Sequence, residues 1–114
     1  RLSPGNHPLT ITYAEALMQD QQSHIAEQVL TEQSKVKAND PYLWYLLAEV
    51  RGLAGNIQGL HQARAEYFIL NGVLDEAEKQ LRYALKLVGN DYTTGARINQ
   101  RLTDIARMRE MLES

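Results

Sequence analysis

The sequence predicts an all-α fold in which antiparallel helical hairpins stack into a short superhelix with a C-terminal capping helix. Apolar residues recur at helical spacing along almost all of the chain. Short connections containing Gly, Asn, Asp and Pro separate the helical segments, and short connections make neighbouring helices antiparallel. Small residues also recur at a spacing of 34, which is the period of a known class of helical repeat.

The first seven residues are predicted to be a linker from an upstream domain, because Pro4, Gly5 and Asn6 are turn formers. The helical domain is then expected to cover residues 8–114. Its first helix is predicted to start at Pro8, since proline suits the first turn of a helix.

The second and third helices are predicted from capping residues. Ser23 is a candidate N-cap for the second helix. Asp40 is a candidate N-cap for the third, with Pro41 at the first helical position. Gly55 followed by Asn56 is a turn signal that separates the third helix from the fourth.

Glycines also mark the ends of the later helices. The fourth helix is expected to stop at Gly72 and the fifth at Gly89. The sixth is expected to start near Asp91 and to carry an apolar stripe through Leu112, which is typical of a long amphipathic helix.

Composition limits the classes of function. The 114 residues are enough for one domain, and a net charge of −2 gives no long-range attraction to nucleic acid. The absence of cysteine excludes disulfides, thiolate metal sites and a cysteine nucleophile. No run approaches the ~20 apolar residues of a membrane span. Because the chain begins at Arg1 without a methionine, we interpret it as part of a longer protein.

The repeat is clearest in its small residues. Ala14 and Ala48 are 34 residues apart, and Ala65 follows 17 residues later, which is half a period. The fourth helix is therefore expected to close the second repeat unit and to open the third. The second half of the chain best fits the tetratricopeptide pattern, through Ala65, Phe68, Gly72, Ala77, Leu81, Ala84 and Leu85. Trp44 is expected in the core, so that its truncation would cost ~3–5 kcal/mol.

Two arginines, Arg51 and Arg64, fall where the repeat pattern calls for apolar groups. The favoured interpretation turns both toward solvent. If either were buried it would need a carboxylate partner, because an unpaired buried charge is very costly, and Glu49, Glu66 and Glu78 are the candidates.

The last helix mixes charges of both signs around its apolar stripe. Basic and acidic residues are interspersed there, which favours a solvated capping face over a nucleic-acid surface. These residues are Arg97, Arg101, Asp104, Arg107, Arg109, Glu110 and Glu113.

Three segments carry a family resemblance: residues 4–17 (PGNHPLTITYAEAL), 43–48 (LWYLLA) and 96–102, which begins Ala-Arg-Ile and ends in Leu. Through them the chain resembles the C-terminal tetratricopeptide domain of periplasmic zinc metallopeptidases that support outer-membrane β-barrel assembly. The resemblance covers nearly the whole chain.

The resemblance implies a two-part parent protein in the bacterial envelope. An N-terminal peptidase domain, absent here, would carry a His-Glu-x-x-His zinc site, so no cofactor is expected in this chain. The repeats would contact their own peptidase domain and recruit polypeptides, either unfolded or outer-membrane protein substrates or the β-barrel assembly machinery.

The histidines of this chain do not reproduce that zinc site. None of His7, His24 and His61 is followed four residues later on a helix by a second histidine or a carboxylate. Each is interpreted as an isolated surface histidine, and His7 alone lies near the expected upstream domain.

A binding groove is expected along the first helix of each hairpin. The predicted groove residues are Ile11, Glu15, Met18, Tyr42, Tyr45, Glu49, Gln62, Glu66 and Ile69. Tyrosines there suit extended or partly unfolded polypeptide, whereas glutamates disfavour a C-terminal carboxylate ligand. The alternative is that these glutamates belong to solvated helix faces.

The sequence bears on four classes of function. A non-catalytic interaction module of an envelope peptidase is favoured. A hydrolase would need a convergent nucleophile and base, and the sequence shows none. A nucleic-acid binder conflicts with the charge. A stand-alone tetratricopeptide scaffold unrelated to a peptidase stays open, because only residues upstream of Arg1 distinguish it.

Overall fold

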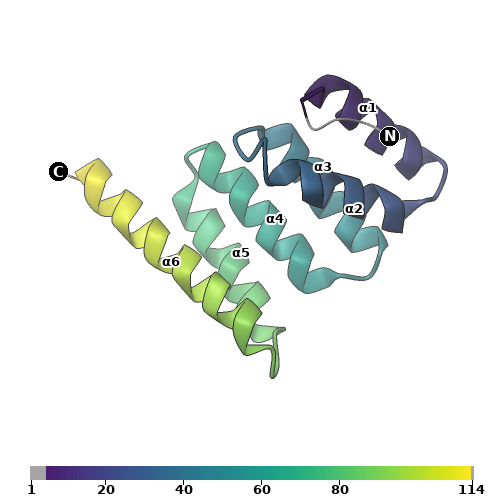
Figure 1. The fold of residues 1–114 in the computed structure, drawn as a ribbon. Coiled ribbons are helices and arrows are strands. Elements are labelled where there is room, and N and C mark those ends of the chain that lie inside the picture. Colours follow the sequence, from purple (N-terminus) through teal and green to yellow (C-terminus); the bar gives the residue numbers. More distant parts are fainter. Residues whose placement is uncertain (1–4, 114) are drawn as a thin grey trace.

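The computed structural model describes residues 5–113, which form six α-helices and no strand (Figure 1). This confirms the predicted all-α fold. The helices are α1 (His7–Gln19), α2 (Ser23–Ser34), α3 (Pro41–Leu53), α4 (Ile57–Leu70), α5 (Leu74–Lys86) and α6 (Tyr92–Glu113). Neighbouring helices pack side by side in chain order, and α6 projects beyond the others toward the C-terminus.

The helix starts follow the predicted caps with two corrections. Asp40 caps α3 by accepting a hydrogen bond of 2.9 Å from the amide of Tyr42, as expected. The first helix begins at His7, because Asn6 accepts a 3.2 Å bond from a later amide and acts as its N-cap. Part of the predicted linker is therefore helical, and residues 1–4 lie outside the described range. Ser23 is the first residue of α2 rather than its N-cap.

The turns reproduce the repeat period in the backbone. Gln21, Gly55 and Gly72 each have positive φ, at 60°, 83° and 75°, and they are spaced by 34 and then 17 residues. After each one, an amide bonds back to a carbonyl five residues earlier, at 2.8, 2.8 and 2.9 Å. This is a helix stop of the Schellman type. The half-period shift is thus a property of the turns as well as of the alanines.

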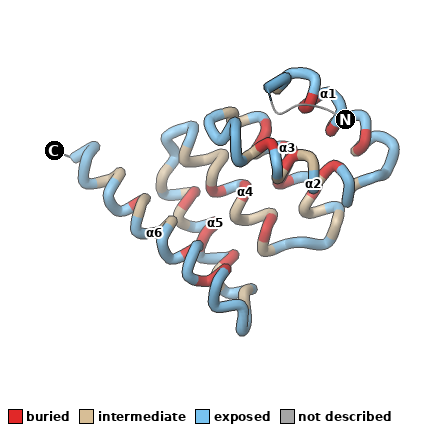
Figure 2. Tube along the Cα trace, in the orientation of Figure 1, coloured by how far each residue is buried: buried red, intermediate tan, exposed pale blue. Residues whose placement is uncertain are grey.

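Two hydrophobic cores meet at α4. The N-terminal core consists of Ile11, Ala14, Leu17, Ala26, Leu30, Leu43, Leu46, Leu47, Ala48, Val50 and Ala63. The C-terminal core consists of Ala65, Ala77, Leu81, Ala84, Ile98 and Ile105. In Figure 2 the buried segments run along the inner sides of the helices, and the far end of α6 is exposed. The exposed end of the stripe includes Leu112, which the sequence pattern placed among its apolar members.

Trp44 is half-buried and packs against the N-terminal core, so the prediction of a core position holds only in part. Its indole Nε1 donates a 2.8 Å hydrogen bond to the carbonyl of Ala38, in the connection before α3. The side chain therefore both packs on the core and fixes this connection.

Candidate functional site

The predicted groove residues do not share one face. Ile11 is buried in the N-terminal core, which corrects its assignment to a groove. Met18 packs against that same core, and Ile69 packs against the C-terminal core. The remaining six divide between two surfaces on different sides of α4.

The register of α4 explains the division. At about 100° per residue, Ala63 and Ala65 point to different sides of the helix and enter the two cores. Arg64 lies between them on one side, and Gln62 and Glu66 lie about 160° away from it. A helix shared by two repeat units therefore presents one face toward α3 and another toward α6.

The first surface is named the aromatic face and comprises Glu15, Tyr42, Tyr45, Glu49, Arg64, Tyr67 and Phe68. Tyr42 and Tyr45 stack with ring centroids 6.2 Å apart. Tyr45 and Tyr67 continue the row across from α3 to α4 at 6.1 Å, and Phe68 follows at 5.5 Å. Tyr42 and Tyr45 are 45% and 54% exposed, so this row is a surface feature.

Tyr42 is positioned by α1. Its hydroxyl donates a short hydrogen bond to the Glu15 carboxylate. That bond raises the pKa of Tyr42, and burial and the charges of Glu15 and Glu49 act in the same direction. The predicted groove members Glu15 and Tyr42 are therefore in direct contact, as a shared groove requires.

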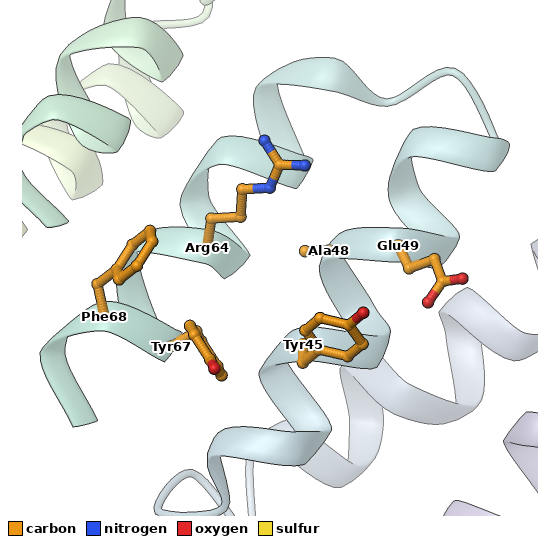
Figure 3. Close-up of a pocket in the computed structure, with 6 residues that line it drawn as sticks. All are labelled: Tyr45, Ala48, Glu49, Arg64, Tyr67 and Phe68. Atoms are coloured by element: carbon orange, nitrogen blue, oxygen red, sulfur yellow. The ribbon is translucent and has the colours of Figure 1, made fainter. Parts of the chain in front are cut away.

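A cavity of about 270 Å³ opens between α3 and α4, lined by Tyr45, Ala48, Glu49, Arg64, Tyr67 and Phe68. In Figure 3 the Tyr45 and Tyr67 rings lie on the two sides of the gap between the helices. Arg64 extends from α4 toward the α3 side, and Glu49 stands on α3 at the edge away from Phe68. Small Ala48 leaves the space that the aromatic rings surround.

The second surface is named the ion-pair face and comprises Trp44, Arg51, Gln62, Glu66, Arg97 and Arg101. Together with Ser34, Leu81 and Ile98, these residues line a cavity of about 240 Å³. Arg101 of α6 binds Glu66 of α4 through two hydrogen bonds of 2.7 and 2.8 Å. This pairing raises the pKa of Arg101, although burial opposes it. Glu66 is therefore held by α6, which corrects its assignment to an open groove.

The predicted solvated face of α6 is wrong at two arginines. Arg101 is half-buried against α4, and Arg109 reaches α5, where it binds Asp75 at 2.7 Å and also pairs with Glu78. The pKa of Glu78 is lowered most by its hydrogen bond from Arg82 of the same helix and next by its hydrogen bond from Arg109. The charges of α6 thus attach the helix to its neighbours.

Arg51 is also placed differently from the prediction. Its side chain is only 16% exposed and lies 3.6 Å from the Glu27 carboxylate of α2, a partner that the repeat pattern did not indicate. It donates to the Gly59 carbonyl at 3.1 Å and to Thr31 at 3.4 Å. Burial lowers the pKa of Arg51, and Glu27 opposes that effect. Arg64, in contrast, is exposed as predicted.

Two histidines are not isolated. His7 lies 2.7 Å from the Asp40 carboxylate and 2.8 Å from the Gln33 amide, so it joins α1 to the start of α3 and the end of α2. His61 bonds to Gln80 at 2.7 Å. His24 is exposed. Within residues 5–113 there is no cluster of three or more His, Asp or Glu side chains able to hold a metal ion.

Sequence reasoning missed Arg64, Tyr67 and Phe68 as members of the site. The half-period shift contained the necessary signal. A helix that ends one unit and starts the next has two registers, and the groove prediction used only the register of the third unit. The register of the second unit would have placed these α4 residues opposite α3.

Comparisons with known proteins give no match, either to a family model or to a curated protein. Among the described residues, no helix combines the length and the apolar character that crossing a membrane requires.

Proposed function

We propose that this chain is a non-catalytic module that binds other polypeptides through its aromatic face. The observation that carries the proposal is the row of Tyr42, Tyr45 and Tyr67, which crosses two helices beside an open cavity. The row includes none of the residues buried in the two cores.

Tyrosine suits such a role for a physical reason. Its ring offers a large contact area while losing little conformational entropy on binding, and its hydroxyl accepts or donates hydrogen bonds to a peptide backbone. Mutual stacking and the bond from Tyr42 to Glu15 hold the rings in place before a partner arrives. Preorganisation of this kind reduces the entropic cost of binding.

The fuller form of the proposal rests on the resemblance stated above. In that form the domain recruits unfolded or outer-membrane polypeptides, or the β-barrel assembly machinery, for a zinc-dependent peptidase of the bacterial periplasm. Zinc would belong to the peptidase domain. A stand-alone scaffold is the alternative, and the full coding sequence of the gene decides between them. A His-Glu-x-x-His segment there supports the peptidase form.

The binding role is tested by replacing Tyr42 and Tyr45 with alanine. The probe is a fluorescein-labelled, urea-unfolded outer-membrane β-barrel protein diluted into buffer, and binding is followed by fluorescence anisotropy. We expect at least about tenfold weaker binding, because central aromatic residues dominate such interfaces.

Tyr92→Ala is the matched control, because Tyr92 is 83% exposed and lies at the start of α6. It should leave binding unchanged, and circular dichroism should show that all variants remain helical. Equal binding by the wild type and the double variant would contradict the proposal.

The non-catalytic character is tested separately. The purified chain is incubated with zinc and a fluorogenic casein substrate, and we expect no turnover. Zinc-dependent cleavage that persists through repurification would contradict this part of the proposal.

A further inference from the structure

In the part of the chain that the structure describes, two charged side chains beside the cavity between α3 and α4 have no ionic partner, unlike the charged residues that link one helix to another. Arg101 with Glu66, Arg109 with Asp75, and Arg51 with Glu27 are pairs between different helices. Arg64 and Glu49 line one cavity from facing helices, yet neither side chain makes a hydrogen bond or an ion pair within the described residues.

The cavity also has a restricted size. At about 270 Å³ it lies at the lower end of the ~300–1,000 Å³ that is typical of small-molecule and cofactor sites. Its walls are mainly the rings of Tyr45, Tyr67 and Phe68 with the small Ala48. This volume and lining fit one large apolar side chain.

We propose that this cavity selects a polypeptide segment in which a large apolar side chain stands between an acidic and a basic residue. The apolar side chain fills the space between the two tyrosines. The acidic residue pairs with Arg64 and the basic residue pairs with Glu49. This inference rests on the proposed function and adds a charge pattern to it.

The charges of Arg64 and Glu49 are the reason to expect a peptide that carries both an acidic and a basic residue. A guanidinium forms two parallel hydrogen bonds with a carboxylate, and such bonds are stronger than neutral ones. When a ligand covers the rings, water is displaced from around Arg64 and the local dielectric falls, which strengthens the pairing. Opposite charges on the two sides of the cavity also determine the direction in which the segment lies.

The test is a selection from a library of random dodecapeptides displayed on phage against the immobilised full chain. We expect enriched peptides to contain Phe, Tyr, Trp or Leu flanked by one acidic and one basic residue. A synthetic peptide of the enriched sequence is then titrated against Arg64→Glu, and we expect roughly tenfold weaker binding. Replacing the acidic residue of that peptide by lysine should restore the affinity for this variant.

Glu49→Lys is expected to show the converse preference, and Arg107→Glu is the control, because Arg107 is an exposed arginine of α6 away from the cavity. Enriched peptides that need Tyr45 but lack the charge pattern, or an Arg64→Glu affinity equal to wild type, would overturn this inference and leave the proposed function standing. Failure to enrich any peptide would overturn both.

Discussion

The two halves of the molecule are held together by different means. The N-terminal core buries Leu30, Leu43, Leu47 and Val50 almost completely, and α1, α2 and α3 all contribute to it. The C-terminal core has fewer large buried side chains, and α6 is additionally attached by arginines that reach α4 and α5.

For α6 the attachment by charges follows from its position at the end of the array. An inner helix is covered on both sides and can bury apolar residues around much of its circumference. A terminal helix has one covered side, so its remaining surface must be polar. Here the polar residues next to the covered side form ion pairs across to the neighbouring helices. We therefore expect the N-terminal half to depend mainly on packing, beside its pair of Arg51 with Glu27, and the C-terminal half to depend more on charge.

The largest expected effect is in the N-terminal core. Leu47→Ala should lower the free energy of unfolding by ~2–5 kcal/mol, because Leu47 is fully buried and its truncation leaves a cavity. Urea unfolding followed by circular dichroism measures this change. Leu53→Ala is the control on the same helix, because Leu53 is 65% exposed, and it should change stability by less than ~0.5 kcal/mol. A Leu47→Ala effect as small as the control would contradict the packing described for this core.

An intermediate effect is expected for the pair that joins α6 to α4. Glu66→Gln should cost ~1–2 kcal/mol, since it weakens the double hydrogen bond to Arg101, whose side chain is one-third exposed. Arg101→Met combined with Glu66→Gln gives a double-mutant cycle that isolates the interaction. Additive effects of the two substitutions would show that the pair does not stabilise the fold.

The smallest expected effect is a difference in acid sensitivity. Arg101 and Gln100 lower the pKa of Asp104, and Arg82 and Arg109 lower the pKa of Glu78. Because these folded-state values lie below the unfolded ones, the pairs stabilise the fold above about pH 4. Their contribution disappears as the pH falls through the lowered pKa values.

The difference in acid sensitivity between α6 and α3 is measured by amide hydrogen exchange, followed by NMR between pH 7 and pH 3. Amides of α6 should lose protection at a higher pH than amides of α3, once the change in intrinsic exchange rate is corrected. Asp104→Asn should remove part of the pH dependence of α6. If amides of α3 lose protection at a higher pH than amides of α6, the expected difference between the two halves is contradicted.

Local signals in the sequence were sufficient for the helices. Asp40 with Pro41 and the glycines at 55 and 72 mark where helices begin and end, because caps and positive-φ turns depend on residues close in the chain. Gln21 shows the limit of this reasoning. It adopts positive φ at the place where the other hairpins have glycine, so the turn recurs there without the glycine signal.

The candidate site was only partly accessible from the sequence. Tyr42, Tyr45 and Glu15 were predicted on a shared surface, and the structure brings them together. Gln62 and Glu66 were assigned to the same groove but lie on the ion-pair face. A period of 34 indicates which residues are equivalent, whereas the faces of a shared helix depend on what packs on each side of it.

By itself the sequence therefore determined the class of fold, the helix boundaries to within about three residues, the period and its half-period shift. Tertiary structure alone decided that Arg51 pairs with Glu27, that Arg101 pairs with Glu66, and that Arg64 and Glu49 line one cavity without pairing. The physical reason is distance along the chain. Caps and turns act over a few residues, whereas these pairs join helices whose relative rotation is set by the packing of both cores.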